Sequence, residues 1–194
     1  MRCGGVAGIM AATLIGMSTS IGSATPGSPL LRSPLVGQWQ RVLTCKELVG
    51  DLKRAGLGAM VAQAWVGQTS STGESSFKPG SPKPTRAHPC RGAIARKHSH
   101  FFTASGQFGS LDWHGGQVDD GAFRVVNRRT VKINNVSFHF AVRNGNALSL
   151  APVLTRAMIR RALANPTSFT PAFWAVTVAS AGHTWKRVPC PRCG

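Results

Sequence analysis

The chain has 194 residues, and its 23 Lys and Arg residues outnumber 6 Asp and Glu residues, which gives a formal net charge of +17 at pH 7. This length accommodates one domain with a sizeable core, and a content of 42% hydrophobic and only 15% charged residues excludes a wholly disordered chain. No apolar run reaches the roughly 18 to 20 residues that a membrane-spanning helix requires, so no such helix is expected.

The N-terminus has the organisation of a secretory signal peptide. Arg2 supplies a positive charge, residues 6–17 are apolar, and Gly22 and Ala24 occupy the −3 and −1 positions of a cleavage site. We therefore expect residues 1–24 to be a signal peptide that is cleaved after Ala24, and the mature protein to be secreted. The alternative interpretation of the apolar stretch is a short buried helix.

The cysteines fit the same localisation. Cys3 would leave with the signal peptide, and an exported chain with an even number of remaining cysteines predicts disulfide bonds. The alternative, free buried thiols, fits an oxidising compartment poorly. The four remaining cysteines, which allow three pairings, are Cys45, Cys90, Cys190 and Cys193.

Two segments have the composition of chain without regular structure. Residues 25–35 are rich in Pro and Ser and are interpreted as an N-terminal spacer before the folded domain, which we assign to residues 36–194. Residues 68–89 are rich in Ser, Pro, Gly and Lys and have no apolar period, which predicts a long mobile surface loop within that domain.

The first regular elements lie between these two segments. A short strand at residues 39–43 is followed by Thr44 and Glu47, which have the spacing of a capping box. This spacing predicts a helix over residues 45–55. A second short helix is expected over residues 59–67.

From residue 98 onward, short strands alternate with turn residues. A three-residue loop at Asn144-Gly145-Asn146 would pair Val142 with Leu148 and Phe140 with Leu150, which aligns the apolar faces of two strands. The string Asp119-Asp120-Gly121 is interpreted as a turn before a strand. The expected strands are residues 98–103, 107–114, 122–127, 130–134, 136–143 and 147–153.

The C-terminal part returns to helix before a last strand. A helix is expected at residues 155–164, a further segment at 170–182 favours a helix, and a closing strand is expected at 183–188. Counting the strand at 39–43, eight strands follow one another in simple succession, and such strands can close into a barrel. The predicted fold class is therefore mainly β with helical insertions: an up-and-down antiparallel β-barrel with helices after the first strand and before the last.

Gly37, Gln38 and Trp39 match the G-x-W motif that opens the first strand of lipocalins, and Lys186 or Arg187 on the last strand could cover this tryptophan. On these residues and the strand pattern, the chain resembles lipocalins and related calycin barrels, including small exported proteins of actinobacterial type. The resemblance implies a closed barrel that binds a small apolar or amphipathic ligand. The chain departs from lipocalins in its helices, which are more like the lid of a fatty-acid-binding protein, and in lacking the T-D-Y motif.

The barrel topology bears on both the interior and the disulfides. In consecutive antiparallel strands the end of the first strand lies beside the start of the second, which favours a bond between Cys45 and Cys90. Cys190 and Cys193 would then pair locally, although a redox role, or a cross-link to Cys90 or Cys45, stays open.

One apolar face of the barrel strands would either line a ligand cavity or fill a solid core. It comprises Phe138, Phe140, Val142, Leu148 and Leu150.

Four polar side chains form the candidate ligand-binding site. A three-residue loop with a left-handed Gly106 would place His100 opposite Ser110 and His98 opposite Asp112 on one face of a hairpin, which His114 would join by alternation. Imidazoles beside a carboxylate are suited to hold a divalent metal or a polar ligand. The alternatives are a solvated polar face or a satisfied internal pair, and a two-residue loop would dissolve the cluster. The candidate residues are His98, His100, Asp112 and His114.

The strong positive charge suggests a second function. The sequence has no nucleic-acid recognition motif, so specific nucleic acid is not an expected partner. An exported basic protein would be attracted to anionic cell-wall polymer or to an anionic membrane surface, in a salt-dependent way. The alternative to ligand binding is therefore a cell-envelope-associated protein with a scaffold barrel, and the bland explanation of the charge is solubility with high Arg usage.

Motifs of known enzyme classes are missing from the sequence. It has no G-x-S-x-G, H-E-x-x-H, P-loop or dinucleotide-binding G-x-G-x-x-G motif. An enzymatic role would require His98, His100 and Asp112 to converge in a pocket. The sequence leaves the cofactor, the metal, the identity of the ligand and the oligomeric state undetermined.

Overall fold

The computed structural model describes residues 33–60, 71–82, 84–85, 87–164 and 182–193. Several expectations therefore fall wholly or mostly outside the described residues. They are the signal peptide at 1–24, most of the spacer at 25–35, the second helix at 59–67, the start of the loop at 68–89 and the segment at 170–182.

The strands form one closed barrel in which each pairs with its neighbours in chain order and β1 pairs with β8, always antiparallel. This confirms the predicted up-and-down β-barrel. The strands are β1 (Gly37–Leu43), β2 (Arg96–Phe102), β3 (Gln107–Leu111), β4 (Gln117–Asn127), β5 (Thr130–Ile133), β6 (Val136–Arg143), β7 (Ala147–Pro152) and β8 (Thr184–Val188).

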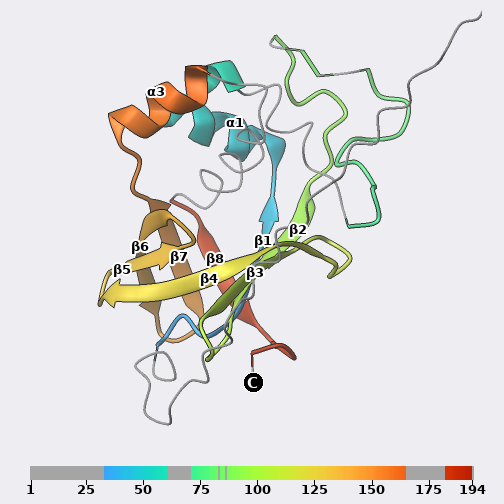
Figure 1. Cartoon of the computed structure of the whole chain (residues 1–194). Coiled ribbons are helices and arrows are strands. Elements are labelled where there is room, and N and C mark those ends of the chain that lie inside the picture. Colours follow the sequence, from blue (N-terminus) through green and yellow to red (C-terminus); the bar gives the residue numbers. More distant parts are fainter. Residues whose placement is uncertain (1–32, 61–70, 83, 86, 165–181, 194) are drawn as a thin grey trace, which may run out of the picture.

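Helices follow the first strand and precede the last, as predicted. They are α1 (Cys45–Arg54), a 3-10 turn η1 (Gly58–Met60) and α3 (Arg156–Ala164). Figure 1 shows α1 and α3 together at one end of the barrel. Met158 and Ile159 of α3 pack against the buried apolar cluster that includes Leu48 and Leu52 of α1, so the two helices cover this end as one layer. No helix among the described residues is long and apolar enough to cross a membrane.

The capping box fixes where α1 begins. The Thr44 side chain accepts a hydrogen bond from the backbone N–H of Glu47 at 3.2 Å, and the Glu47 carboxylate accepts one from the backbone N–H of Thr44. Two N–H groups that the first turn of a helix leaves unpaired are thereby satisfied. The helix therefore starts where the sequence predicts.

The two hairpin registers that the sequence predicts are confirmed. Gly106 adopts a left-handed φ of 88°, and His100 lies opposite Ser110. Phe140 lies opposite Leu150, as the three-residue loop requires. The expectation of a turn at residues 119–121 was wrong, because the hairpin turn comes earlier, around Gly115, and this string pairs with β3 inside β4.

Both predicted disulfides are present, Cys45–Cys90 and Cys190–Cys193. The first has an S–S distance of 2.05 Å and ties the start of α1 to the segment before β2. The second joins two residues at the end of the chain that are three apart in sequence. Paired cysteines are typical of an oxidising compartment.

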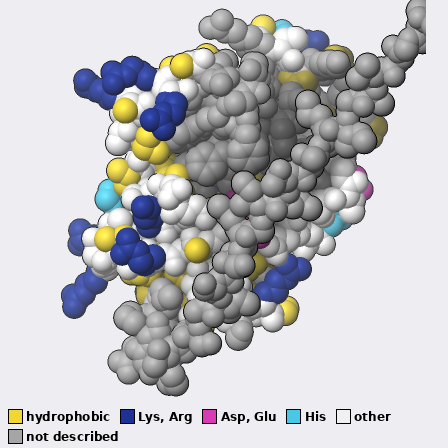
Figure 2. All heavy atoms as spheres, in the orientation of Figure 1, with side chains coloured by type: hydrophobic (Ala, Val, Ile, Leu, Met, Phe, Trp, Pro, Cys, Tyr) yellow, Lys and Arg dark blue, Asp and Glu magenta, His cyan; other side chains and the backbone are white. Residues whose placement is uncertain are grey.

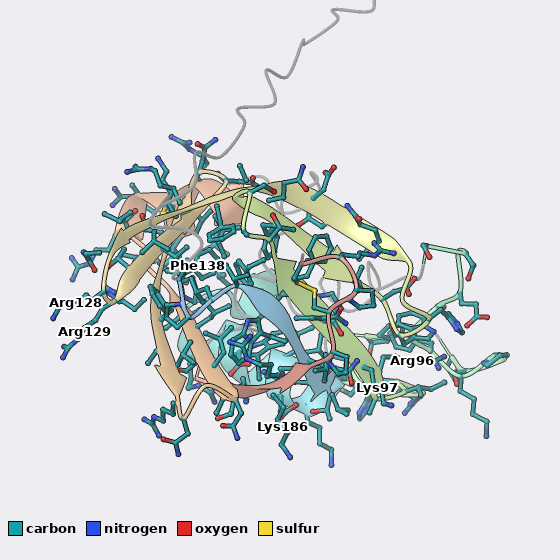
Figure 3. The ribbon with its side chains drawn as sticks, turned by 90° about the horizontal axis from the view of Figure 1, so that it is seen from below. Arg96, Lys97, Arg128, Arg129, Phe138 and Lys186 are labelled. Atoms are coloured by element: carbon teal, nitrogen blue, oxygen red, sulfur yellow. A yellow bond between two sulfur atoms is a disulfide. The ribbon has the colours of Figure 1, made fainter. Side chains whose placement is uncertain are left out.

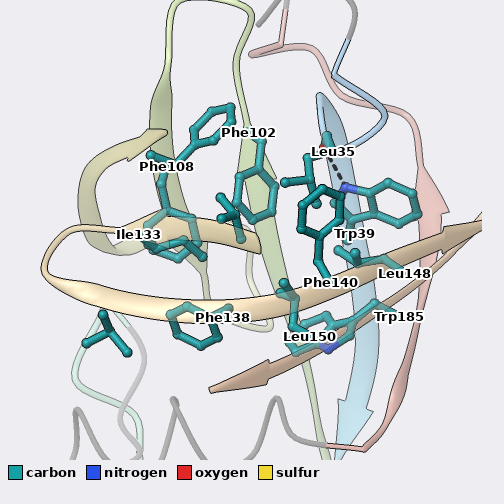
Figure 4. Close-up of a cluster of buried hydrophobic side chains, with 13 residues drawn as sticks. Leu35, Trp39, Phe102, Phe108, Ile133, Phe138, Phe140, Leu148, Leu150 and Trp185 are labelled. Carbon is teal, nitrogen blue, oxygen red and sulfur yellow. Dashed lines mark hydrogen bonds between the residues drawn. The ribbon is translucent and has the colours of Figure 1, made fainter. Parts of the chain in front are cut away.

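The core of the barrel is a contiguous apolar cluster (Figure 4). The face with Phe138 and Leu150, for which the sequence left open a cavity or a solid core, packs within this cluster. Rings interlock across strands, with the Phe102 centroid 5.3 Å from Phe108 and 5.1 Å from Phe123. The largest side chains with less than 2% exposure in the cluster include Trp39, Trp185, Phe102, Leu35 and Leu148.

Gly37, Trp39 and Arg187 close one end of the barrel as a unit. The Trp39 indole donates a hydrogen bond to the carbonyl of Leu35 at 2.8 Å, and the Arg187 guanidinium carbon lies 4.3 Å from the Trp39 ring centroid. Gly37 has a φ of 139°, and a Cβ there would collide with the Arg187 guanidinium. Arg187 thus covers the tryptophan, as the resemblance to lipocalins implied, and the barrel is compatible with a lipocalin-like fold.

Candidate functional site

The interior of the barrel changes from apolar to polar towards the end covered by α1. Trp39 and Arg41 alternate inward on β1 and lie opposite His100 and His98 of β2. His100 lies in turn opposite Ser110 of β3. We call the inward-facing group at this end the polar cluster; it comprises Arg41, His98, His100, Ser110 and Trp185, all of them buried. Trp185 also packs in the apolar cluster, so it lies where the two meet.

Aromatic contacts hold the polar cluster together. The ring centroids of His98 and His100 are 4.9 Å apart and nearly perpendicular, with an interplanar angle of 86°. The His100 centroid lies 4.5 Å from that of Trp185, and the Arg41 guanidinium carbon lies 5.6 Å from the Trp185 ring centroid. Three strands, β1, β2 and β8, therefore place these groups in mutual contact.

Hydrogen bonding in this cluster is incomplete. Nδ1 of His100 is 2.9 Å from Oγ of Ser110. Nε2 of His98 and Nε1 of Trp185 are buried and have no hydrogen-bond partner in the part of the chain that the structure describes. Leaving such a group unpaired costs about 1–3 kcal/mol. The only other such atom among the described residues is Nε of Arg96, whose guanidinium stacks on Trp113.

Both buried histidines are neutral at pH 7. Burial lowers the pKa of His98 to about 4, the nearby positive charge of Arg41 acts in the same direction, and the negative charge of Asp112 opposes them in part. Burial also lowers the pKa of His100 well below its ordinary value, again with contributions from His98 and Arg41. Each imidazole can therefore donate one hydrogen bond and accept another, depending on its tautomer.

Arg41 supplies a positive charge to this cluster. Its side chain is 5% exposed, and its Nη2 lies 3.1 Å from Oε2 of Glu47 in α1. Burial lowers the pKa of Arg41, whereas the carboxylates of Glu47 and Asp51 favour its charged form. The capping box of α1 thus presents Glu47 to a buried guanidinium.

His183 connects the start of β8 to the acidic residues of α1. Its Nε2 is 2.8 Å from Oδ2 of Asp51, and its Nδ1 is 3.7 Å from Oε1 of Glu47. Asp51 is buried and also pairs with Arg54. These contacts position β8, and with it Trp185, below the helix.

The Asp112 carboxylate makes no hydrogen bond to the two buried histidines in the part of the chain that the structure describes, although it is close enough to raise the pKa of His98 slightly against the effect of burial. The strand β3 ends at Leu111, and the Asp112 carboxylate instead accepts hydrogen bonds from the Ser71 backbone at 2.6 Å, from its hydroxyl at 2.7 Å and from two N–H groups of the hairpin turn. Burial raises the pKa of Asp112, but these hydrogen bonds outweigh it and lower the pKa overall. Asp112 therefore anchors the segment at Ser71.

His114 points to the surface. Its Nε2 lies 2.9 Å from Oε2 of Glu74, and both side chains are about half exposed. The structure therefore brings His98 and His100 together, directs the hydrogen bonds of the Asp112 carboxylate to Ser71 and the hairpin turn, and places His114 at the surface. No group of three His, Cys, Asp or Glu side chains suited to a metal ion occurs among the described residues.

A pocket of about 400 Å³ lies beside the polar cluster, on the outer wall of the barrel. It opens where β1 and β8 separate, since their pairing ends at Gln40 and Lys186. Arg41 lines this pocket and also stacks on Trp185, so it is the shared wall between the pocket and the cluster. The pocket is lined by Gln40, Arg41, Val42, Glu47, Lys97, His183, Thr184 and Lys186.

Sequence reasoning missed Arg41, Glu47 and Trp185 as site residues. Alternation from Trp39 was the available signal, because two residues further along the strand is the same face. A charged residue in a strand is ordinarily expected to face solvent, so Arg41 was not recognised as an interior residue. Glu47 was recognised only for its role in the capping box.

No protein-family model matches the chain, and no curated protein matches it. Function must therefore be inferred from the chemistry of these residues.

Proposed function

We propose that the protein is a secreted, lipocalin-like barrel that binds a small amphipathic ligand at the polar cluster. The observation that carries this proposal is the pair of buried, unpartnered nitrogen atoms, Nε2 of His98 and Nε1 of Trp185. Nearly all buried polar groups in proteins are hydrogen-bonded, so two exceptions in one cluster call for a partner. A ligand with polar atoms would supply it.

The surroundings favour a ligand that is only partly polar. Beyond the polar cluster, the barrel interior is filled by packed apolar side chains. A ligand would therefore bind at the end of the barrel that α1 covers. There, the packed rings of His100 and Trp185 form an apolar wall beside the unpaired nitrogens. Small-molecule sites typically combine apolar walls with a few placed polar groups.

Secretion is part of the same proposal. Two disulfides fit an oxidising compartment, and residues 1–24 have the order of a cleavable signal peptide. An exported binding protein of this kind would store, carry or sequester its ligand outside the cell.

Native mass spectrometry of the protein, recovered from its host's medium without reducing agent, tests the proposal. We expect a mass above that of the chain cleaved after Ala24 with two disulfides, and loss of the excess on denaturation. The double variant H98L/W185F removes both unpaired nitrogens and should lose the excess mass, whereas H139Q, at an exposed histidine of β6, should keep it. A bare cleaved chain would contradict ligand binding.

A second candidate is association with an anionic cell-envelope polymer, and the distribution of charge favours it. From Gly121 to the C-terminus the sequence contains no Asp or Glu. Figure 2 shows Lys and Arg side chains grouped on the side that carries α3 and the β4–β5 hairpin, and Arg128 and Arg129 form the tip of this hairpin (Figure 3). Salt-sensitive retention on an immobilised anionic polysaccharide, weakened in R128Q/R129Q, is the expected result; unchanged retention would argue against this face.

A further inference from the structure

The pocket between β1 and β8 has the chemistry of an anion site. Lys97 lies opposite Val42 on β2, and Lys186 lies opposite Gln40 on β8, so the two lysines flank β1 from either side (Figure 3). Both are exposed at the mouth of the pocket, and Arg41 lies at its inner wall. Against these three positive charges, the lining residues include one carboxylate, that of Glu47.

The positive charges of the pocket run from exposed lysines at its mouth to a buried arginine at its inner wall. Exposed lysines raise the local concentration of anions at the mouth. Arg41 is buried, and a guanidinium can bind a carboxylate or a similar group through two parallel hydrogen bonds. Val42, which is 51% exposed, adds apolar surface beside these charges. A small organic anion with an apolar part fits each of these features.

We propose that this pocket binds a small organic anion, which pairs with Arg41 in place of Glu47. The proposal rests on the proposed ligand-binding function and names the class of ligand. It places the anionic group against Arg41, which the pocket shares with the polar cluster, and the apolar part of the ligand beside Val42.

Glu47 is suited to act as the displaced partner. Its side chain is 39% exposed, so water can solvate its carboxylate in place when an anion replaces it on Arg41, whereas the Arg41 side chain is buried. Its remaining contacts, with Thr44 and with His183, do not require the ion pair. Glu47 therefore competes with the ligand for one guanidinium, and the affinity for anions should rise when that competition is removed.

A matched pair of fluorescent probes tests the proposal. 1-Anilinonaphthalene-8-sulfonate carries a sulfonate, and N-phenyl-1-naphthylamine has the same ring system without it. We expect the sulfonate probe to bind the mature protein about tenfold more tightly than the neutral one at low ionic strength. Fluorescence titration of each probe gives both dissociation constants.

The decisive variant is E47Q. Glutamine preserves the capping box at this position but carries no charge, so the sulfonate probe should bind about three- to tenfold more tightly, with no change for the neutral probe. R41Q should raise the dissociation constant of the sulfonate probe at least about tenfold. If R41Q does not fold, E47Q still decides, because a fall or no change in sulfonate affinity would overturn the proposal.

The lysines are tested by charge-matched double variants. K97Q/K186Q should raise the dissociation constant of the sulfonate probe about fivefold at low salt and less than about twofold near 0.5 M NaCl. K53Q/K78Q makes the same change in net charge at exposed residues outside the pocket, and should leave the affinity within about twofold. Equal effects of the two double variants would overturn the site. Equal binding of the two probes would overturn anion selectivity alone, and failure of both probes to bind would also overturn the proposed function.

Discussion

The two halves of the barrel interior treat buried polar groups in opposite ways, and two tryptophans on the paired strands β1 and β8 display the difference. Trp39 is fully buried and donates its indole N–H to the carbonyl of Leu35. Trp185 is 1% exposed, and its indole N–H has no partner among the described residues. In the apolar half, packing and hydrogen bonding both stabilise the fold. The polar half leaves buried polar groups without hydrogen-bond partners, as proteins do at functional sites.

The largest expected difference between the halves is in the free energy of unfolding. Phe102→Ala opens a cavity in the apolar cluster beside Phe108 and Phe123, and should cost about 3–5 kcal/mol. His98→Leu replaces a buried imidazole that has an unpaired nitrogen by an apolar side chain of similar size, and should cost less than about 1 kcal/mol or stabilise the protein. Urea unfolding at pH 7 measures both.

The comparison breaks down if the two variants lose similar stability. That result would mean that His98 is as well packed and as fully satisfied as Phe102. The double variant C190S/C193S, which leaves both halves of the interior untouched, is the control for nonspecific effects of substitution on the exported protein.

Acid should destabilise the protein through its polar half. The pKa of His98 is about 4 in the folded protein against an ordinary 6.5, so the unfolded chain takes up a proton first as the pH falls. Stability is therefore complete above about pH 6.5 and is lost progressively towards about pH 4. For this one histidine the loss between pH 7 and pH 5 is about 2 kcal/mol.

The control for this pH dependence is His98→Leu, which removes the titrating group. Urea unfolding at pH 7 and pH 5 should show a smaller loss in the variant than in the wild type, by about 2 kcal/mol. Equal losses in the two proteins would show that His98 is accessible to protons in the folded state, and would place it outside the buried cluster.

The apolar half is also the half that the sequence predicts best. Turn chemistry at Gly106 and at residues 144–146 determines two hairpin registers, and these registers determine which side chains meet. The G-x-W motif anticipates the contact between Trp39 and Arg187. Such features depend on residues that are close together in the sequence or that lie on adjacent strands of the barrel.

The polar half depends on contacts that local patterns do not encode. Continued by one residue, the register would place Asp112 opposite His98, but β3 ends at Leu111 and the Asp112 carboxylate pairs with Ser71, 41 residues earlier. Arg41 lies on the inward face of β1 that Trp39 begins, and Glu47 of α1 pairs with its charge there. A charge that is buried beside a partner from another element breaks the rule that charged residues face solvent, so the sequence pointed to the two histidines of the polar cluster and not to its arginine.

The smallest expected effect is the sharpest test of the comparison, because it changes one N–H group in each half. Trp39→Phe removes the indole N–H and leaves the carbonyl of Leu35 unpaired, which should cost about 1–3 kcal/mol more than Trp185→Phe. Both substitutions remove a similar ring volume at a buried site beside an arginine, so the lost volume cancels in the difference between them. Urea unfolding of the ligand-free protein measures that difference. Equal costs would mean that the Trp185 N–H is satisfied in solution, and the polar half would then need no ligand to complete it.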